Sequence, residues 1–181
     1  MRFLLLVCGI WLGIFGRVSA QDDYYLSPKG NFKMKITPEW VFDDMDDDGN
    51  VVFYNADTLI GVMRVTTTTL EPGIDLREYL EAEQVETKGS ILIQLNGYPA
   101  LYHQETYLEE VDSVREQIVQ HYWLTGHNQT LLVASYSILK RFQGTDLAEK
   151  ELSDAKDALS TLVITQPFIP PTEKTTPAIK P

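Results

Sequence analysis

TLLVASYSIL at residues 130–139, followed by LAEKELSDAKDALSTL at residues 147–162, decides the fold of this chain. The first stretch is a continuous strand pattern, whereas the second has the spacing of an amphipathic helix. The apolar stripe of that helix consists of Leu147, Leu152, Ala155, Leu159 and Leu162. The charged residues predicted to lie largely away from the stripe are Glu149, Lys150, Glu151, Asp154 and Lys156. A helix with such a stripe must cover it against a sheet, which predicts an α+β domain.

Further segments of the chain carry the apolar pattern of strands. They span residues 32–36, 51–55, 59–68, 91–95, 98–107 and 114–124. Most are separated by turn residues, namely Asp48-Gly49-Asn50, Asn96-Gly97 and Gly126-His127-Asn128. Because short turns join antiparallel neighbours, the sequence predicts a central antiparallel sheet.

A second helix is predicted to begin after a cap at Asp75 and to run to about Thr87, with Gly89 beyond its end. Residues at spacings of three or four form its packing face, and they are Leu76, Tyr79, Leu80 and Glu83. Each helix has to cover its stripe on the sheet, so the expected architecture is an antiparallel sheet flanked by helices.

Both ends of the chain differ from this domain in composition. Residues 1–20 have Arg2 before an apolar run, Arg17 after it and the ending Val18-Ser19-Ala20, which is typical of a secretory signal peptide cleaved after Ala20. Residues 21–29 are polar and are expected to be loose. Residues 166–181 hold five of the nine prolines and are expected to form a disordered tail. A single domain is therefore predicted over residues 30–165.

The charge and the cysteine content exclude several classes of function. Cys8 is the one cysteine and lies inside the predicted signal peptide, so disulfides, thiolate metal sites and cysteine nucleophiles are not expected after it. The 26 acidic side chains outnumber 15 basic ones and give a net charge of −11. This balance opposes binding to nucleic acid or to anionic lipid. We also expect no membrane-spanning segment after the signal peptide has been removed.

Several short motifs resemble the PsbP/DcrB-like superfamily, and in particular its bacterial exported members of unknown function. They are Gly30-Asn31-Phe32, Ile36-Thr37-Pro38-Glu39-Trp40, Leu95-Asn96-Gly97-Tyr98-Pro99-Ala100 and Tyr122-Trp123, followed by a long strand and the terminal amphipathic helix. The resemblance implies an α/β/α sandwich with a central antiparallel sheet. It also implies an accessory or binding role at the cell envelope, and it supplies no catalytic motif.

An aspartate-rich stretch at residues 43–50 is the most suggestive local feature. Asp44, Asp46, Asp48 and Gly49 occupy positions 1, 3, 5 and 6 of a calcium-binding loop. Position 12, however, is Asn55 in place of the bidentate glutamate, and the flanking segments are predicted strands instead of helices. The sequence favours a solvated hairpin turn, and a weak calcium site at Asp44, Asp46 and Asp48 is the alternative.

No other pattern of chemically active residues forms a known motif. His103, His121 and His127 lack the spacing of a zinc site, and neither a nucleophile elbow around serine nor a glycine-rich phosphate loop is present. The aromatic residues that could line a cleft are predicted to be core residues instead, and they are Tyr98, Tyr102, Tyr122, Trp123 and Tyr136.

These patterns together predict an exported, non-enzymatic domain, periplasmic or secreted, that binds a protein partner or a small ligand and has no cofactor. Two alternatives stay open. One is a calcium-responsive module that uses the aspartate-rich turn. The other is a hydrolase that uses carboxylates together with His103 or His121.

Overall fold

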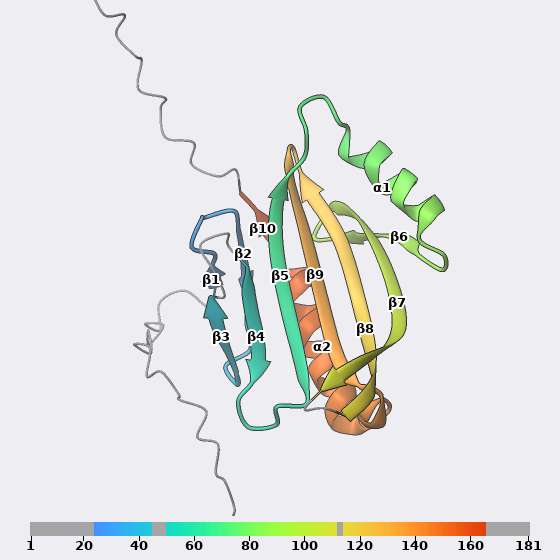
Figure 1. The fold of residues 1–181 in the computed structure, drawn as a ribbon. Coiled ribbons are helices and arrows are strands. Elements are labelled where there is room, and N and C mark those ends of the chain that lie inside the picture. The colour runs from blue at the N-terminus through green and yellow to red at the C-terminus, as the bar shows by residue number, and fades with distance from the viewer. Residues whose placement is uncertain (1–23, 45–49, 112–113, 166–181) are drawn as a thin grey trace, which may run out of the picture.

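The structure is a computed structural model that describes residues 24–44, 50–111 and 114–165 (Figure 1). Within these residues the main sheet has seven antiparallel strands in the order β3-β4-β5-β9-β8-β7-β6. They are β3 (Trp40–Asp44), β4 (Val51–Asn55), β5 (Gly61–Thr69), β6 (Ile91–Leu95), β7 (Tyr98–Val111), β8 (Val114–His127) and β9 (Thr130–Leu139). A smaller antiparallel sheet has the order β1-β2-β10. Its strands are β1 (Tyr24–Leu26), β2 (Phe32–Lys35) and β10 (Val163–Ile164).

The predicted strands are present, and the predicted bounds of β4, β6 and β9 are confirmed. One predicted turn is wrong: β8 continues through Gly126 to His127, and the turn follows at Asn128, whose φ is +53°. Gly126 lies between Leu76 and the Thr130 carbonyl oxygen, where a Cβ atom would clash. Glycine at this position therefore permits close packing inside the strand and does not mark a turn.

The N-terminal part of the domain departs from the single-sheet prediction. Residues 24–26, expected to belong to a loose segment, pair with β2 as a strand, and β2 joins the small sheet instead of the main one. Tyr25 explains this difference. It is buried, and its ring centroid lies 4.8 Å from that of Phe42 and 4.9 Å from that of Phe53, both on the main sheet. Burial of these aromatic rings holds the first residues of the domain in place.

Two α-helices and one short 3-10 helix, η1 (Lys140–Phe142), complete the described part. Helix α1 (Leu76–Glu86) begins after Asp75, whose carboxylate accepts hydrogen bonds from two backbone N–H groups, and ends at Thr87 as predicted. Helix α2 (Asp146–Ser160) begins after Thr145. Most of its predicted stripe is buried, but Leu147 is exposed and Leu162 follows the end of the helix.

The two helices lie on opposite faces of the main sheet (Figure 1). Helix α2 packs against β5 and β9 of the main sheet and against β2 of the small sheet, which closes the hydrophobic core. Helix α1 packs against β6, β7 and β8 on the other face. The architecture is therefore a sheet flanked by helices, as expected, although the sheet dominates and α1 covers only one end of its face.

Glu151 is an exception to the prediction that the charged residues of α2 lie largely away from its apolar stripe. Its side chain is buried, with 1% of its surface exposed. The Tyr136 hydroxyl donates a hydrogen bond to Glu151 Oε2 at 3.0 Å, and the Thr58 hydroxyl donates to Oε1. Gly61 lies against the Tyr136 ring, where a Cβ atom would collide with the hydroxyl end. The glycine thus leaves the space that Tyr136 needs to reach Glu151.

His121 also lies in the core, on the α2 face of β8. Its Nδ1 atom hydrogen-bonds with the Tyr102 hydroxyl at 2.8 Å, and its ring lies near those of Trp123 and Tyr136. Burial lowers the pKa of His121 below its ordinary value of 6.5, nearby Lys156 lowers the pKa further, and Glu149 opposes the shift. The histidine is therefore neutral in the folded protein at pH 7.

The predicted signal peptide (residues 1–20) and the predicted Pro-rich tail (residues 166–181) lie outside the described residues. Among the residues that are described, no helix has the length and apolar character needed to span a membrane.

We predict that Glu151→Ala lowers the free energy of unfolding by about 3 kcal/mol, because it leaves the Tyr136 hydroxyl buried without an acceptor and creates a cavity. Urea denaturation measures this loss. Glu149→Ala on the exposed side of the same helix is the matched control and is expected to change stability by less than about 0.5 kcal/mol. Equal effects of the two substitutions would contradict the structural role of Glu151.

The lowered pKa of His121 leads us to expect a loss of stability in mild acid. Below about pH 6.5 the unfolded chain binds a proton at this histidine while the folded chain does not, so the free energy of unfolding falls as the pH drops from about 6.5 to the lowered pKa of the folded state and levels off below it. We expect His121→Gln to reduce the change in stability between about pH 7.5 and pH 5 by on the order of 1 kcal/mol. His127→Gln, at an exposed position on the same strand, is the control substitution. Identical pH dependence in wild type and His121→Gln would disprove the assignment.

Candidate functional site

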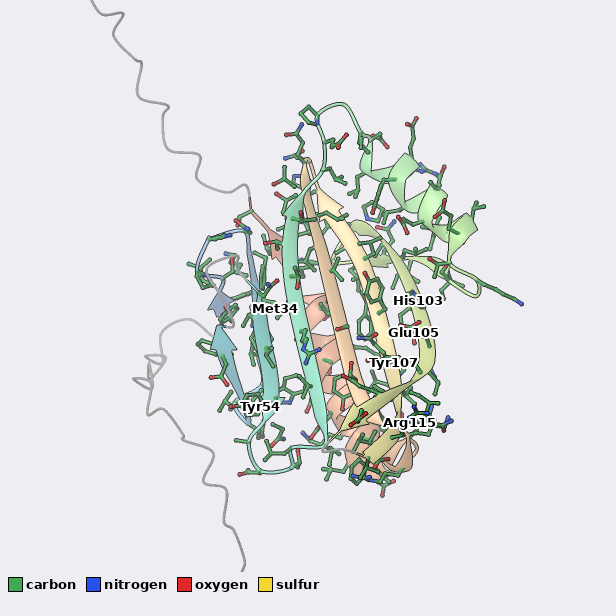
Figure 2. The ribbon with its side chains drawn as sticks, viewed as in Figure 1. Met34, Tyr54, His103, Glu105, Tyr107 and Arg115 are labelled. Carbon is green, nitrogen blue, oxygen red and sulfur yellow. The ribbon has the colours of Figure 1, made fainter. Side chains whose placement is uncertain are left out.

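The face of the main sheet opposite α2, here called the outer face, carries the candidate site. Across this face His103 on β7 lies opposite Tyr122 on β8, and Tyr122 lies opposite Ser135 on β9. Arg64 on β5 continues the same row beyond Ser135. Figure 2 shows the outer-face residues His103, Glu105 and Tyr107 following one another down β7, next to the end of the sheet that α1 covers.

A cleft of about 290 Å³ opens between α1 and the outer face, and we call it the α1 cleft. The apolar side chains that line it are Leu101, Leu124, Leu131 and Val133. The polar side chains that line it are Tyr79, Glu83, Thr87, His103, Glu105 and Tyr122. Apolar walls with a few converging polar groups are the usual composition of a small-ligand site, and this cleft is at the small end of the usual range of volumes.

The tyrosines of the α1 cleft are hydrogen-bond donors at neutral pH. Burial raises the pKa of Tyr79, and its hydrogen bond with Glu83 raises the pKa further. Burial also raises the pKa of Tyr122, and the nearby carboxylates of Glu83 and Glu105 add to that shift. Both phenols therefore keep their protons, and the two carboxylates give the rim a negative charge.

His103 lines the α1 cleft and has a hydrogen-bonding group without a partner in the described residues. Its ring centroid lies 4.9 Å from that of Tyr122. Its Nδ1 atom is buried and has no hydrogen-bond partner among the residues that the structure describes. A buried polar atom without a partner costs free energy, and Nδ1 itself is not exposed to the cleft.

The aspartate-rich turn lies mostly outside the described residues. Asp46 and Asp48 belong to the segment 45–49, which is not described, and Asp44 is described only through its backbone as the last residue of β3. Strands β3 and β4 pair antiparallel on either side of this segment, with Asp44 opposite Val51, so it connects the strands of a hairpin. In the described ranges no group of acidic, histidine or cysteine residues has the arrangement of a metal site.

The three histidines lie in different places. His103 lines the α1 cleft, His121 lies in the core on the opposite face of the sheet, and His127 is exposed at the end of β8. Because β8 continues through Gly126, the predicted turn does not separate His121 from His127, and both lie on one face of the strand. Their surroundings nevertheless differ, because His121 is buried and His127 is exposed.

The aromatic residues divide between the two faces of the sheet. Trp123 and Tyr136 are core residues, as predicted, and Tyr98 and Tyr102 pack against the core while remaining partly exposed. Tyr122 lies on the other face, where it packs against a second, smaller hydrophobic core under α1 and also lines the α1 cleft.

Sequence reasoning placed Tyr79 and Glu83 on the packing face of a helix without identifying them as site residues. The available signal was Glu83 itself, a carboxylate at the spacing of an apolar stripe. A charged residue at such a position lies at the contact between the helix and the sheet, where it can face a cleft.

One solved structure similar to this chain is a protein from Bacteroides thetaiotaomicron VPI-5482. The two are 21% identical with a TM-score of 0.64, and the match covers 81% of this chain. It covers 49% of the other chain, so the present chain spans about half the length of that protein. This similarity shows the shared fold.

Three further solved structures are similar at a TM-score of 0.49. LpqN, described as involved in cell envelope biogenesis of Mycobacterium tuberculosis, is 14% identical, and the match covers 75% of this chain and 83% of LpqN. Cyanobacterial PsbP from Synechocystis sp. PCC 6803 is 12% identical, with coverage of 85% and 99%. The Saccharomyces cerevisiae Ran-binding protein Mog1p is 11% identical, with coverage of 81% and 96%.

No curated protein matches the sequence of this chain. The family model described as a domain of unknown function, DUF3805, matches residues 20–165 and therefore spans the whole described part of the chain. The chain belongs to the DUF3805 family.

Proposed function

We propose that this chain is a non-enzymatic binding domain whose α1 cleft takes a small organic cation with a short apolar body. The observation that carries the proposal is the composition of the cleft, in which carboxylates of Glu83 and Glu105 stand over an apolar wall. An ammonium or guanidinium group would pair with these carboxylates, while the apolar body of the ligand would contact the leucine and valine side chains.

The aromatic residues of the cleft suit the same ligand. Tyr79 and Tyr122 line the cleft, the face of a tyrosine ring attracts a cation, and both hydroxyl groups stay protonated because their pKa values are raised. Charge favours a cation over an anion as well, since the chain has 26 acidic against 15 basic side chains. An anionic ligand in this cleft would be repelled by the carboxylates of Glu83 and Glu105. No lysine or arginine is among the described residues that line the cleft.

A binding role is favoured over hydrolysis by the surroundings of His103. A histidine that acts as a general base in a hydrolase is oriented by a hydrogen bond to its second nitrogen. The Nδ1 atom of His103 has no such partner in the described part of the chain, and His121 lies on the other face of the sheet. Recognition of a ligand by His103 needs no orienting partner.

Export of this binding domain is part of the proposal. It is supported by the composition of residues 1–20, with Arg2, an apolar run and a small-residue ending. A binding domain outside the cytoplasm would meet its ligand at the cell envelope or in the surroundings of the cell. Pulse labelling with detection of a mature chain beginning at Gln21 tests this part, and a chain that retains residues 1–20 would contradict it.

The amine-binding proposal is tested with tyramine, phenethylamine and agmatine, each measured by isothermal titration calorimetry. 4-Hydroxyphenylacetate is the matched anion, because it has the ring of tyramine with a carboxylate in place of the amine. We expect at least one amine to bind with a Kd between about 1 μM and 1 mM and the anion to bind at least tenfold more weakly.

The variant Glu83→Gln with Glu105→Gln should raise the Kd for that amine by at least about tenfold, because it removes both charges from the rim. Glu109→Gln on the same strand as Glu105 is the control, since Glu109 does not line the α1 cleft. No binding of any of the three amines, or equal losses in the variant and the control, would sink the proposal.

A further inference from the structure

A second groove, distinct from the α1 cleft, lies on the other side of α1 and against β6. Its volume is about 500 Å³. The side chains that line it are Arg77 and Leu80 of α1, Leu92, Ile93 and Gln94 of β6, and Pro99 of β7. We call it the β6 groove. Figure 1 shows β6 at the outer edge of the sheet beside α1. One wall of the groove is thus a helix and the other is an edge strand.

Strand β6 is an edge strand without the usual protection against pairing. In the described residues it is hydrogen-bonded to β7 alone, at the end of the seven-stranded order. Its sequence ILIQL has no charged residue and no proline, and Ile91 and Leu92 are 52% and 44% exposed. The opposite edge, β3, ends in Asp43 and Asp44, and charged residues are a common means of keeping an edge from pairing.

We propose that the β6 groove binds an extended segment of a partner protein, which pairs with β6 as an additional strand. The free edge of β6 presents backbone N–H and C=O groups, and a second strand satisfies such a row of alternating donors and acceptors. Strand addition between an edge strand and a helix is an established mode of peptide recognition, in which the backbone supplies affinity and side-chain pockets supply specificity.

The direction of the β6 side chains predicts the pattern of the partner segment. Leu92 lies opposite Leu101 on the outer face and lines the β6 groove, whereas Ile91 lies opposite Tyr102 on the α2 face. Because the side chains of a strand alternate, every second residue of the added strand would face Leu80 and Leu92. The partner segment therefore carries apolar side chains at alternate positions.

The charge of α1 indicates a basic segment. Helix α1 has one arginine against four glutamates, and Arg77 is already paired with Glu81, with 3.0 Å between Nε and Oε1. Glu78 and Glu86 are exposed on the same helix. The glutamates lie outside the lining of the groove, so lysine or arginine residues of the partner segment would be attracted to the net negative charge of the helix as a whole.

The same charges argue against a second copy of this chain as the occupant. Two β6 strands paired around a two-fold axis would bring both acidic α1 helices to the same face of the joined sheet. Like charges close together disfavour that arrangement. A heterologous basic segment has no such penalty.

The experiment uses the full chain and a phage-displayed pool of twelve-residue peptides. In this pool Val, Ile, Leu, Phe or Tyr at every second position alternates with Thr, Lys or Arg, and a matched pool has Glu in place of Lys and Arg. We expect enrichment from the basic pool, and a Kd of about 1–100 μM for the selected peptides when synthesised. Alternate residues of the peptide direct their backbone N–H groups toward β6, and the residues between them direct theirs away. N-methylation of the first set should therefore abolish binding, and N-methylation of the second set should leave it intact.

Leu92→Thr and Ile91→Thr form a matched pair, since both side chains are about half exposed on the same strand and differ in the face they occupy. Leu92→Thr should weaken peptide binding about tenfold, and Ile91→Thr less than threefold. Equal effects of the two variants, equal enrichment from the acidic pool, or insensitivity to N-methylation would each overturn the proposal. Sedimentation of the protein alone as a dimer that Leu92→Thr dissociates would overturn it too, by making a second copy the occupant.

Discussion

The packing of α2 against the main sheet is the interaction on which the rest of the structure depends. Ala155 and Leu159 are fully buried there, and the helix joins the main sheet to the small one. Even the charged Glu151 is enclosed by this packing, where the Tyr136 hydroxyl satisfies it. Whereas α2 and the small sheet cover one face of the main sheet, α1 covers one end of the opposite face, over Leu101, Leu124 and Leu131, and the two hollows lie beside that contact.

Helix α1 determines where the outer face has hollows, because it contacts the sheet through a narrow apolar stripe. Leu80 is its one buried residue in the structure, so the helix makes a narrow contact with the sheet and leaves a hollow on each flank. A helix with a broader apolar stripe would have filled both hollows. The narrow stripe of α1, with Glu83 in it, is thus the sequence feature behind both candidate sites.

Local pattern predicted much of the fold, and the remainder depended on contacts between distant residues. The bounds of α1 follow from Asp75 and those of β9 from a continuous apolar run, because caps and periodicity act within a few residues. The burial of Glu151 could not be predicted, since it requires Tyr136 to lie opposite and Gly61 to leave room. The α1 cleft was missed for a similar reason, because it forms only when a helix meets strands far away in the sequence.

The small sheet joins the first and last described parts of the domain, because β10 pairs with β2 through Val163 and Ile164. The side chain of Asn96 also donates a hydrogen bond to the Leu162 carbonyl oxygen at 2.7 Å. The β2–β10 pairing spans most of the sequence, and contacts between such distant residues raise the contact order and slow folding. During synthesis β2 lacks its second neighbour until residues 163–164 have left the ribosome. The domain therefore completes its folding only after residues 163–164 have been made, although most of its main sheet is encoded before them.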